Sequence, residues 1–241
     1  MENPLHHFEL HPLIPIHVFG LDLSINQAVI MMWVVVAAVS LFFWSALRYR
    51  QLVPTKIQSM AEMSVEFLRG MVLDNMGEKG MRFFPFIFTL FFFILFANLI
   101  GLIPGTYTIT SQIMVTGLFA IIVYVMSLFV GFSIHGLHFL KILVPPGTPI
   151  LLLPLMIFLE VFSQMLRPVT LSVRLFANMT AGHTILIVLF SLMLGGGVLI
   201  GWLPFVFTVP VYILEVFVAF LQAFIFTILA TVYIGEAIKL H

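Results

Sequence analysis

The sequence predicts an all-α integral membrane protein with about five membrane helices, and three observations support this fold class. Hydrophobic residues make up 62% of the 241-residue chain and charged residues 8%, against about 45–50% and about 25% in soluble domains. Several apolar segments reach the roughly 20 residues that a helix needs to cross a bilayer. The last two segments are about twice that length, so we expect two long, strongly tilted helices there.

The composition also excludes several classes of function. The formal net charge is zero, so nothing favours nucleic acid as a partner, and the absence of cysteine excludes disulfides and thiolate chemistry. Residues 1–25 contain no Lys or Arg before an apolar core, so we expect no cleavable signal or transit peptide. His6, His7 and His11 resemble a metal-binding tract, but they stand in a polar tail, and we expect neither a metal nor a cofactor.

Taken in order, the elements of one membrane domain, residues 1–241, begin with a tail on the outer side, residues 1–26. Single-length membrane helices follow at 27–47, 83–103 and 111–134. Pro85 falls in the first turn of the second of these helices, where the missing amide hydrogen costs nothing.

The two long segments, 150–194 and 199–234, exceed what one perpendicular crossing requires. Forty-five helical residues reach about 67 Å, whereas the hydrocarbon layer is about 30 Å thick. A hairpin inside the first segment needs turn residues, and only Arg167-Pro168 offers any. We therefore expect one tilted helix with a local bend at Pro168, and a turn at the glycines 195–197.

Residues 57–80 carry a different pattern, with apolar side chains at helical spacing and charged side chains between them. This pattern predicts an amphipathic helix on the cytoplasmic surface, or one that docks on a partner subunit. Its expected apolar residues are Met60, Val65, Leu68, Met71 and Val72.

The distribution of basic residues predicts the orientation of the chain. Loops that carry Lys and Arg remain in the cytoplasm, and with five crossings this places the N-terminus outside and the C-terminus inside. The eight basic residues that fit are Arg48, Arg50, Lys56, Arg69, Lys79, Arg82, Lys141 and Lys239. Arg167 and Arg174 remain, inside the first long segment.

Ionisable groups within the membrane cost about 2.5–3.5 kcal/mol each on insertion scales and are functional candidates by default. The ionisable candidates are Glu160, Arg167, Arg174, His183 and Glu215, and the polar ones include Asn98, Gln164, Asn178 and Gln222. Because the first three are seven residues apart, they lie within about 40° of one another around a helix.

Asn178 follows on nearly the same side of that helix, whereas His183 falls on roughly the opposite side. On the last helix Glu215 and Gln222 are again seven residues apart, and Tyr233 is eighteen residues beyond Glu215. Two polar stripes on two long helices suggest two water-accessible paths separated by an arginine.

Each of these residues also has a structural interpretation. Arg167 can pair with Glu160 or extend to the interface, Glu160 can be a counter-charge, and His183 can be a hydrogen-bonded interior histidine. Glu215 can be a helix-packing acid, provided that it is paired, near water or protonated. Arg174 is harder to explain in this way, because its nearest acid on the same face is fourteen residues away.

His135 and His138 stand at a membrane boundary and are expected to be interfacial. No phosphate-binding loop, zinc motif or nucleophile elbow is present, so we expect no catalytic site in this chain.

The stretch "LRPVTLSVRLFANMTAGH", followed by "LEVFVAFLQAFIFTILATVYIGEA", resembles subunit a of F-type ATP synthases, the membrane stator subunit beside the c-ring. That family carries an Arg-Leu-x-x-Asn run in one long helix and Gln-Ala-Phe-Ile-Phe in the next. "FANLIGLIPG" around Asn98 is also similar, and the likeness covers essentially the full length.

The resemblance implies a role for each candidate residue. Arg174 matches the stator arginine that faces the proton-carrying carboxylate of subunit c and separates two half-channels. His183 and Glu215 match a coupled pair in the outer half-channel, in the arrangement found in mitochondrial and some bacterial members. Asn178 and Gln222 match polar positions near the arginine. Glu160 is assigned to the inner half-channel because it lies toward the cytoplasmic end in the predicted topology. Arg167, Asn98 and Tyr233 are structural or auxiliary candidates.

The resemblance further implies proton transport coupled to ATP synthesis, within the membrane sector CF(0), by a non-catalytic subunit of the two-sector ATPase. The implied partners are the c-ring, subunit b of the peripheral stalk, the rest of the complex, the lipid bilayer and protons. The implied location is the bacterial inner membrane, with an organelle inner membrane as the alternative.

Two other classes of protein remain as alternatives. A proton-coupled secondary transporter predicts inverted repeats and broken helices around a central substrate site, and no repeat is evident in the sequence. A non-conducting membrane scaffold has little need for Arg174 or Glu215. Co-purification with a c-ring distinguishes the stator from both.

Overall fold

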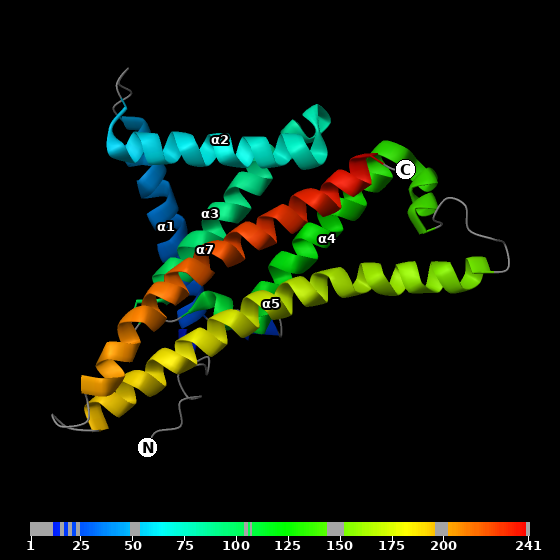
Figure 1. Ribbon diagram of the computed structural model, residues 1–241. Helices are drawn as coiled ribbons and strands as arrows, with labels where there is room; N and C mark the ends of the chain where they lie inside the picture. The colour runs from blue at the N-terminus through cyan, green and yellow to red at the C-terminus, as the bar shows by residue number, and fades with distance from the viewer. Residues whose placement is uncertain are drawn as a thin grey trace. The chain divides into compact units, whose positions relative to one another are not determined.

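The computed structural model describes residues 12–14, 17–18, 21–22, 25–48, 54–103, 106, 108–143, 152–195 and 202–239. Within this part of the chain, five helices are long and apolar enough to cross a membrane. The predicted fold class, an all-α membrane protein, is confirmed. Figure 1 shows the helices along the chain, with both long helices as continuous ribbons.

The helix bounds follow the apolar segments of the sequence. The five membrane helices are α1 (Gln27–Arg48), α3 (Phe84–Gly101), α4 (Ile113–His135), α5 (Leu153–Gly195) and α7 (Trp202–Lys239). The amphipathic helix α2 is Lys56–Met76, and three 3-10 segments are η2 (Glu78–Phe83), η3 (Ile109–Ser111) and η4 (Gly136–Leu143).

The contacts divide the chain into two compact units, which are described separately below. The first unit contains α1, the second half of α3 from Phe92, α5 from Leu175 and α7 up to Phe224. The second unit contains α2, the first part of α3, nearly all of α4, α5 up to Arg174 and the end of α7.

The N-terminal segment contains short strands that the sequence pattern does not predict. β1 (Pro12–Ile14) pairs antiparallel with β4 (Ile25–Asn26), and β2 (His17–Val18) pairs antiparallel with β3 (Leu21–Asp22). Each strand is two or three residues long, below the length at which alternation can be recognised. His6, His7 and His11 lie outside the described residues.

The sequence predicts the amphipathic helix α2 but misplaces its end. The helix ends at Met76, before the expected residue 80, because Gly77 adopts a φ of 70° and caps it. Met60 and Val65, two of the predicted apolar residues, are 56% and 36% exposed, so this part of the apolar stripe does not pack within the chain. The buried side chains are Gln58, Ala61, Leu68, Met71, Val72 and Met76.

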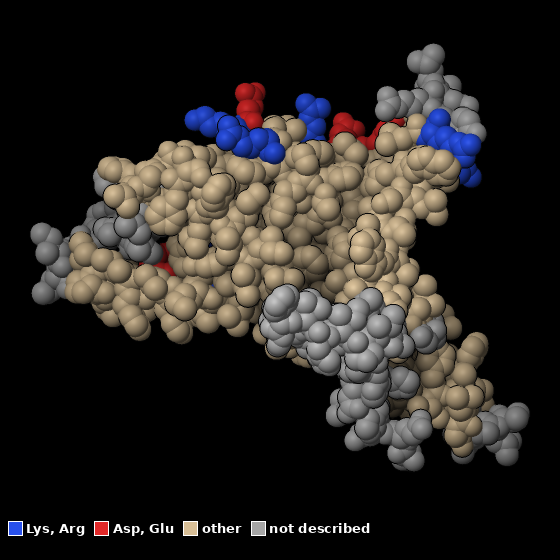
Figure 2. Space-filling view, turned by 180° about the vertical axis from the view of Figure 1, so that it is seen from behind, with Lys and Arg blue, Asp and Glu red and all other residues tan. Residues whose placement is uncertain are grey.

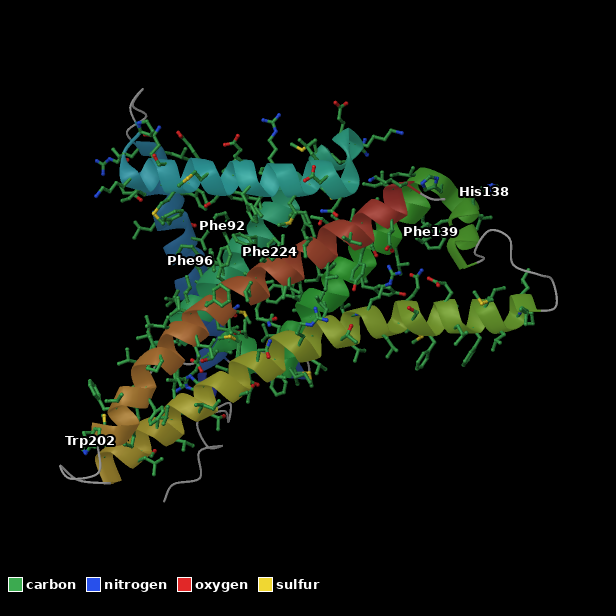
Figure 3. The ribbon with its side chains drawn as sticks, viewed as in Figure 1. Phe92, Phe96, His138, Phe139, Trp202 and Phe224 are labelled. Carbon is green, nitrogen blue, oxygen red and sulfur yellow. The ribbon has the colours of Figure 1, made fainter. Side chains whose placement is uncertain are left out.

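In the first unit, α1 and α3 pack through phenylalanines. The rings of Phe43 and Phe92 meet edge to face with centroids 4.7 Å apart, and Phe42 lies 5.8 Å from Phe96. Figure 3 labels Phe92 and Phe96, one helical turn apart on α3. Edge-to-face pairs add specific geometry to apolar burial, so these rings fix how α3 faces α1.

In the second unit, the chain after α4 folds back on the helix that it leaves. Gly136 has a φ of 56° and permits the turn into η4. The ring of Phe139, labelled in Figure 3, is 5% exposed and occupies the position that a side chain at Gly131 would take.

The exposed side chains of the membrane helices are mostly apolar. Trp33, Leu41 and Trp44 of α1 are 71%, 62% and 57% exposed, and the first residue of α7, Trp202, is 61% exposed. Charged side chains occupy a small part of the face that Figure 2 shows. Such a surface suits contact with lipid, or with other membrane helices.

Candidate functional site

The helix α5 continues without interruption through Pro168 and so carries six of the polar candidates, Glu160, Gln164, Arg167, Arg174, Asn178 and His183. The sequence favoured a single helix over a hairpin here, and the structure confirms this. Arg167, Arg174, Asn178 and His183 therefore stand on one helix of 43 residues. Such a helix is about 65 Å long, more than twice the hydrocarbon thickness.

In the second unit, Arg167 pairs with an acid on α7. Its Nη1 donates to Oε2 of Glu236 at 2.5 Å, and its Cζ lies 4.9 Å from the centre of the Tyr233 ring. The sequence offered Glu160 as the partner, which is wrong. Glu160 instead accepts a hydrogen bond from Nε2 of Gln164 on the same helix, at 3.3 Å.

Arg174 differs from Arg167 although both belong to the same stripe of α5. The side chain of Arg174 is exposed. It makes no hydrogen bond and no ion pair with any residue in the described ranges. A guanidinium stays charged at any accessible pH and is costly within a membrane unless it is hydrated or paired. Arg174 is therefore available to an acidic group outside the described part of the chain.

A polar contact between α4 and α5 helps to set the direction of Arg174. The hydroxyls of Thr116 and Ser172 lie 3.2 Å apart, and both side chains are buried. Leu171, one residue earlier, is 3% exposed. Ser172 is two residues before Arg174 and so lies about 160° away around the helix. With Ser172 buried against α4, Arg174 lies on the opposite side of α5 and is exposed.

In the first unit, Glu215 is held beneath a glycine. The residue is 8% exposed, and its carboxyl group lies so close to α5 that a Cβ on Gly182 would be 2.8 Å from its Cδ. Gly182 immediately precedes His183, which is half-buried. The structure thus brings Glu215 to the turn of α5 that carries His183.

Glu215 is buried without hydrogen-bond partners in the described part of the chain. Neither carboxyl oxygen has a donor or acceptor there. A polar group buried in this way costs free energy unless it is satisfied by water or by another group. The two oxygens are therefore left to a water molecule or to a group outside the described residues.

Two buried amide side chains lie near Glu215: Gln222, on α7 itself, and Asn98, which contacts α7 from α3. Nδ2 of Asn98 on α3 donates to the carbonyl oxygen of Ala219 at 3.2 Å, one helical turn after Glu215. Asn98 is 0% exposed and Gln222 is 6% exposed. Oδ1 of Asn98 has no hydrogen-bond partner among the described residues. These amides add polar atoms to an otherwise apolar region.

The candidate residues thus fall into two groups, one in each unit. Asn98, Asn178, His183, Glu215 and Gln222 belong to the first unit, and Glu160, Arg167, Arg174 and Tyr233 belong to the second. Asn178 is exposed on α5. No three His, Cys, Asp or Glu side chains gather around a possible metal position within the described ranges.

The sequence analysis missed two residues, Glu236 and Gly182. Glu236 lies three residues after Tyr233, and an acid in the last turns of an apolar helix, with an unexplained arginine elsewhere, is a usable signal. Gly182 carries no side chain, so only its contact with Glu215 reveals it.

Comparison with known proteins supports the reading of the motifs. Residues 29–235 match the family model described as ATP synthase A chain. A protein of Rhodospirillum rubrum named ATP synthase subunit a is 42% identical over 241 residues, which is 100% of both chains. Proteins of the same name from Agrobacterium fabrum and Pelagibacter ubique are 46% and 42% identical. The matches cover 98% and 99% of this chain, and 97% and 98% of the relatives.

The family match spans most of the chain, and the relatives match it over nearly its whole length, so the likeness extends over α5 and α7. From this match, together with the five membrane helices, we conclude that the chain belongs to the ATP synthase A chain family, whose members are multi-pass membrane proteins of proton transport and ATP synthesis.

Proposed function

We propose that this chain is the non-catalytic membrane stator of a rotary ATP synthase, acting as one membrane domain beside a ring of carboxylate-bearing subunits. That ring is the c-ring of the complex. The other proposed partners are subunit b of the peripheral stalk and the rest of the complex. The relatives are named ATP synthase subunit a and cover the full chain. Their bacterial origin supports the bacterial inner membrane as the location.

Arg174 separates two half-channels in this proposal. Its guanidinium attracts a ring carboxylate that has lost its proton, and the fixed positive charge blocks protons from passing directly between the two channels. Support comes from its exposure on α5 and from the absence of an ion pair within the described residues.

Glu215 and His183 form the outer half-channel. A proton that enters from outside passes these groups and neutralises a ring carboxylate, which can then rotate into lipid. The burial of Glu215, its unpartnered oxygens and the adjacent Gly182 support this role. Gln222, Asn178 and Asn98 hold or direct water along the way.

Glu160 belongs to the inner half-channel, where the ring carboxylate releases its proton. Its position follows from the orientation that the basic residues favour, with the N-terminus outside and the C-terminus in the cytoplasm. Each charge that crosses supplies about 2.3 kcal/mol per 100 mV of membrane potential, and a rotating ring sums several such crossings for each ATP.

The observation that carries this proposal is the difference between the two arginines of α5. Arg167 is paired within the chain, and Arg174 points outward with no such partner in the described residues. The test is Arg174→Ala in the whole complex, in sealed vesicles, with proton-driven ATP synthesis and passive proton leak measured together. We expect synthesis to be lost. Normal coupled synthesis would sink the proposal.

A further inference from the structure

Arg167 lies in a small cluster that nothing in the proposed proton path uses. Glu236 contacts its guanidinium at 2.5 Å, and the Tyr233 ring lies against it with 4.9 Å between Cζ and the ring centre. Tyr233 and Glu236 are three residues apart and so share one face of α7. The side chains of Arg167 and Glu236 are 24% and 42% exposed. The pair is therefore partly open to its surroundings.

Arg167 and Arg174 stand on one side of α5. Seven residues place them about 10 Å apart along the helix axis and about 20° apart around it. Without a partner, Arg167 is a second fixed cation next to the first. A mobile carboxylate that passes this side of α5 then meets two cations, only one of which separates the half-channels.

We propose that Glu236 neutralises Arg167, so that Arg174 is the one uncompensated cation on this side of α5 that a ring carboxylate meets. Tyr233 assists by covering the guanidinium with its ring. Glu236 is then a positioning residue: by neutralising Arg167, it makes a ring carboxylate pair with Arg174 rather than with Arg167. The inference rests on the proposed stator function and deepens it.

A simpler role for the pair is to join α5 to α7. Two other contacts already hold the end of α7 in the second unit. Nε2 of His135 lies 3.2 Å from the carbonyl oxygen of Ile238. A Cβ on Gly235 would be 2.7 Å from the backbone oxygen of Asn75 on α2, so these backbones pack directly. With these anchors in place, the ion pair is a minor contribution to packing, and its charge matters more.

Three variants separate the two roles: Glu236→Gln, Arg167→Gln and the double variant. If Glu236 masks charge, Glu236→Gln leaves Arg167 unpaired, and the double variant removes that cation again. If the pair only holds α5 against α7, the double variant lacks that contact as fully as Glu236→Gln does, and the two variants should be equally impaired. The matched control is Glu78→Gln, which removes an exposed acid in η2.

The readout is ATP-driven proton pumping by the whole complex in inverted vesicles, with co-purification of the subunit as the measure of assembly. For Glu236→Gln we expect the pumping rate to fall about fivefold. This factor corresponds to about 1 kcal/mol of lost preference of the ring carboxylate for Arg174 over Arg167. We expect the double variant to return to within about twofold of the starting protein, a difference of about 0.4 kcal/mol. Arg167→Gln by itself should have the smaller effect of the two single variants.

Pumping at the starting rate in Glu236→Gln, or a double variant as slow as Glu236→Gln, overturns the masking role. If Glu236→Gln does not assemble, the double variant decides by its pumping rate: pumping within about twofold of the starting protein supports masking, and failure to assemble or to pump overturns it. Arg174→Ala is measured in parallel. If that variant still pumps, the stator proposal itself fails. If it does not pump while Glu236→Gln is normal, only the masking role fails.

Discussion

Gly182 of α5 lies directly against the carboxyl group of Glu215 on α7, and a single methyl group at this position would displace that carboxyl. A Cβ built on Gly182 would stand 2.8 Å from Cδ of Glu215. The displaced atoms are the end of a flexible side chain, so the helices can stay in place while the carboxyl moves.

Gly182→Ala is therefore expected to impair proton flow without preventing assembly. A misplacement of about 1 Å can cost about a hundredfold in a reaction step, and we expect a loss of between about tenfold and a hundredfold in ATP-driven pumping. The control is Gly70→Ala on α2, where a Cβ meets nothing within 4 Å. Equal pumping in the two variants would contradict this account of Gly182.

Glu215→Gln keeps the shape of the side chain and removes its exchangeable proton. Loss of one proton-transfer group typically costs between about a hundredfold and ten thousandfold, so we expect proton-driven ATP synthesis to fall at least about a hundredfold. Glu215→Asp should retain part of the activity, because the carboxyl group remains. Synthesis at the normal rate in Glu215→Gln would show that this carboxyl carries no protons.

Gly235→Ala tests packing at the end of α7, away from the proton path. Here the atom that a Cβ would meet, at 2.7 Å, is the backbone oxygen of Asn75, which cannot rotate away. We expect a destabilisation of about 1–3 kcal/mol, seen as a lower temperature for loss of the subunit from the purified complex. Unchanged thermal stability relative to Gly70→Ala would contradict the close approach of α7 to α2.

Thr116→Val tests the hydrogen bond that links α4 to α5 near Arg174. It removes the hydroxyl that lies 3.2 Å from Ser172 while keeping the branched shape. Hydrogen bonds between membrane helices average about 0.6 kcal/mol, with a maximum of about 1.7, and we expect a loss of stability in this range. Thr116→Ser keeps the hydroxyl, so its stability should be closer to that of the starting protein. If Thr116→Ser were less stable than Thr116→Val, the hydrogen bond would not stabilise the contact between α4 and α5.

The fold class followed from the sequence because apolar length is a strong signal. The end of α5 near the glycines and its continuity through Pro168 were both predictable from the distribution of turn residues. The strands at residues 12–26 were not, since elements of two or three residues have no period to detect. Which apolar residues of α2 pack within the chain was not predictable, since helical spacing alone does not distinguish the buried Leu68 from the exposed Met60 and Val65.

The candidate site was predictable residue by residue, but its contacts were not. Glu215 and His183 could be named from spacing and resemblance. The close contact between Gly182 and the carboxyl group of Glu215 could not, because it depends on how α5 and α7 pack in the first unit. The sequence offered the nearest acid on the same helix, Glu160, as one possible partner of Arg167. The true partner, Glu236, is 69 residues away along the chain, and pairing between helices cannot be obtained from the periodicity of one of them.

The most direct test of the central claim is a cross-link between α5 and a ring subunit, since the chain contains no cysteine. Ala177→Cys and Leu171→Cys place a thiol three residues from Arg174 on either side, at an exposed and a buried position respectively. Each is combined with a ring cysteine one helical turn from the ring carboxylate, in the whole complex. The account predicts a disulfide to the ring from Ala177→Cys and none from Leu171→Cys. Absence of a cross-link at Ala177, with the complex assembled, would contradict a stator arginine that faces the ring.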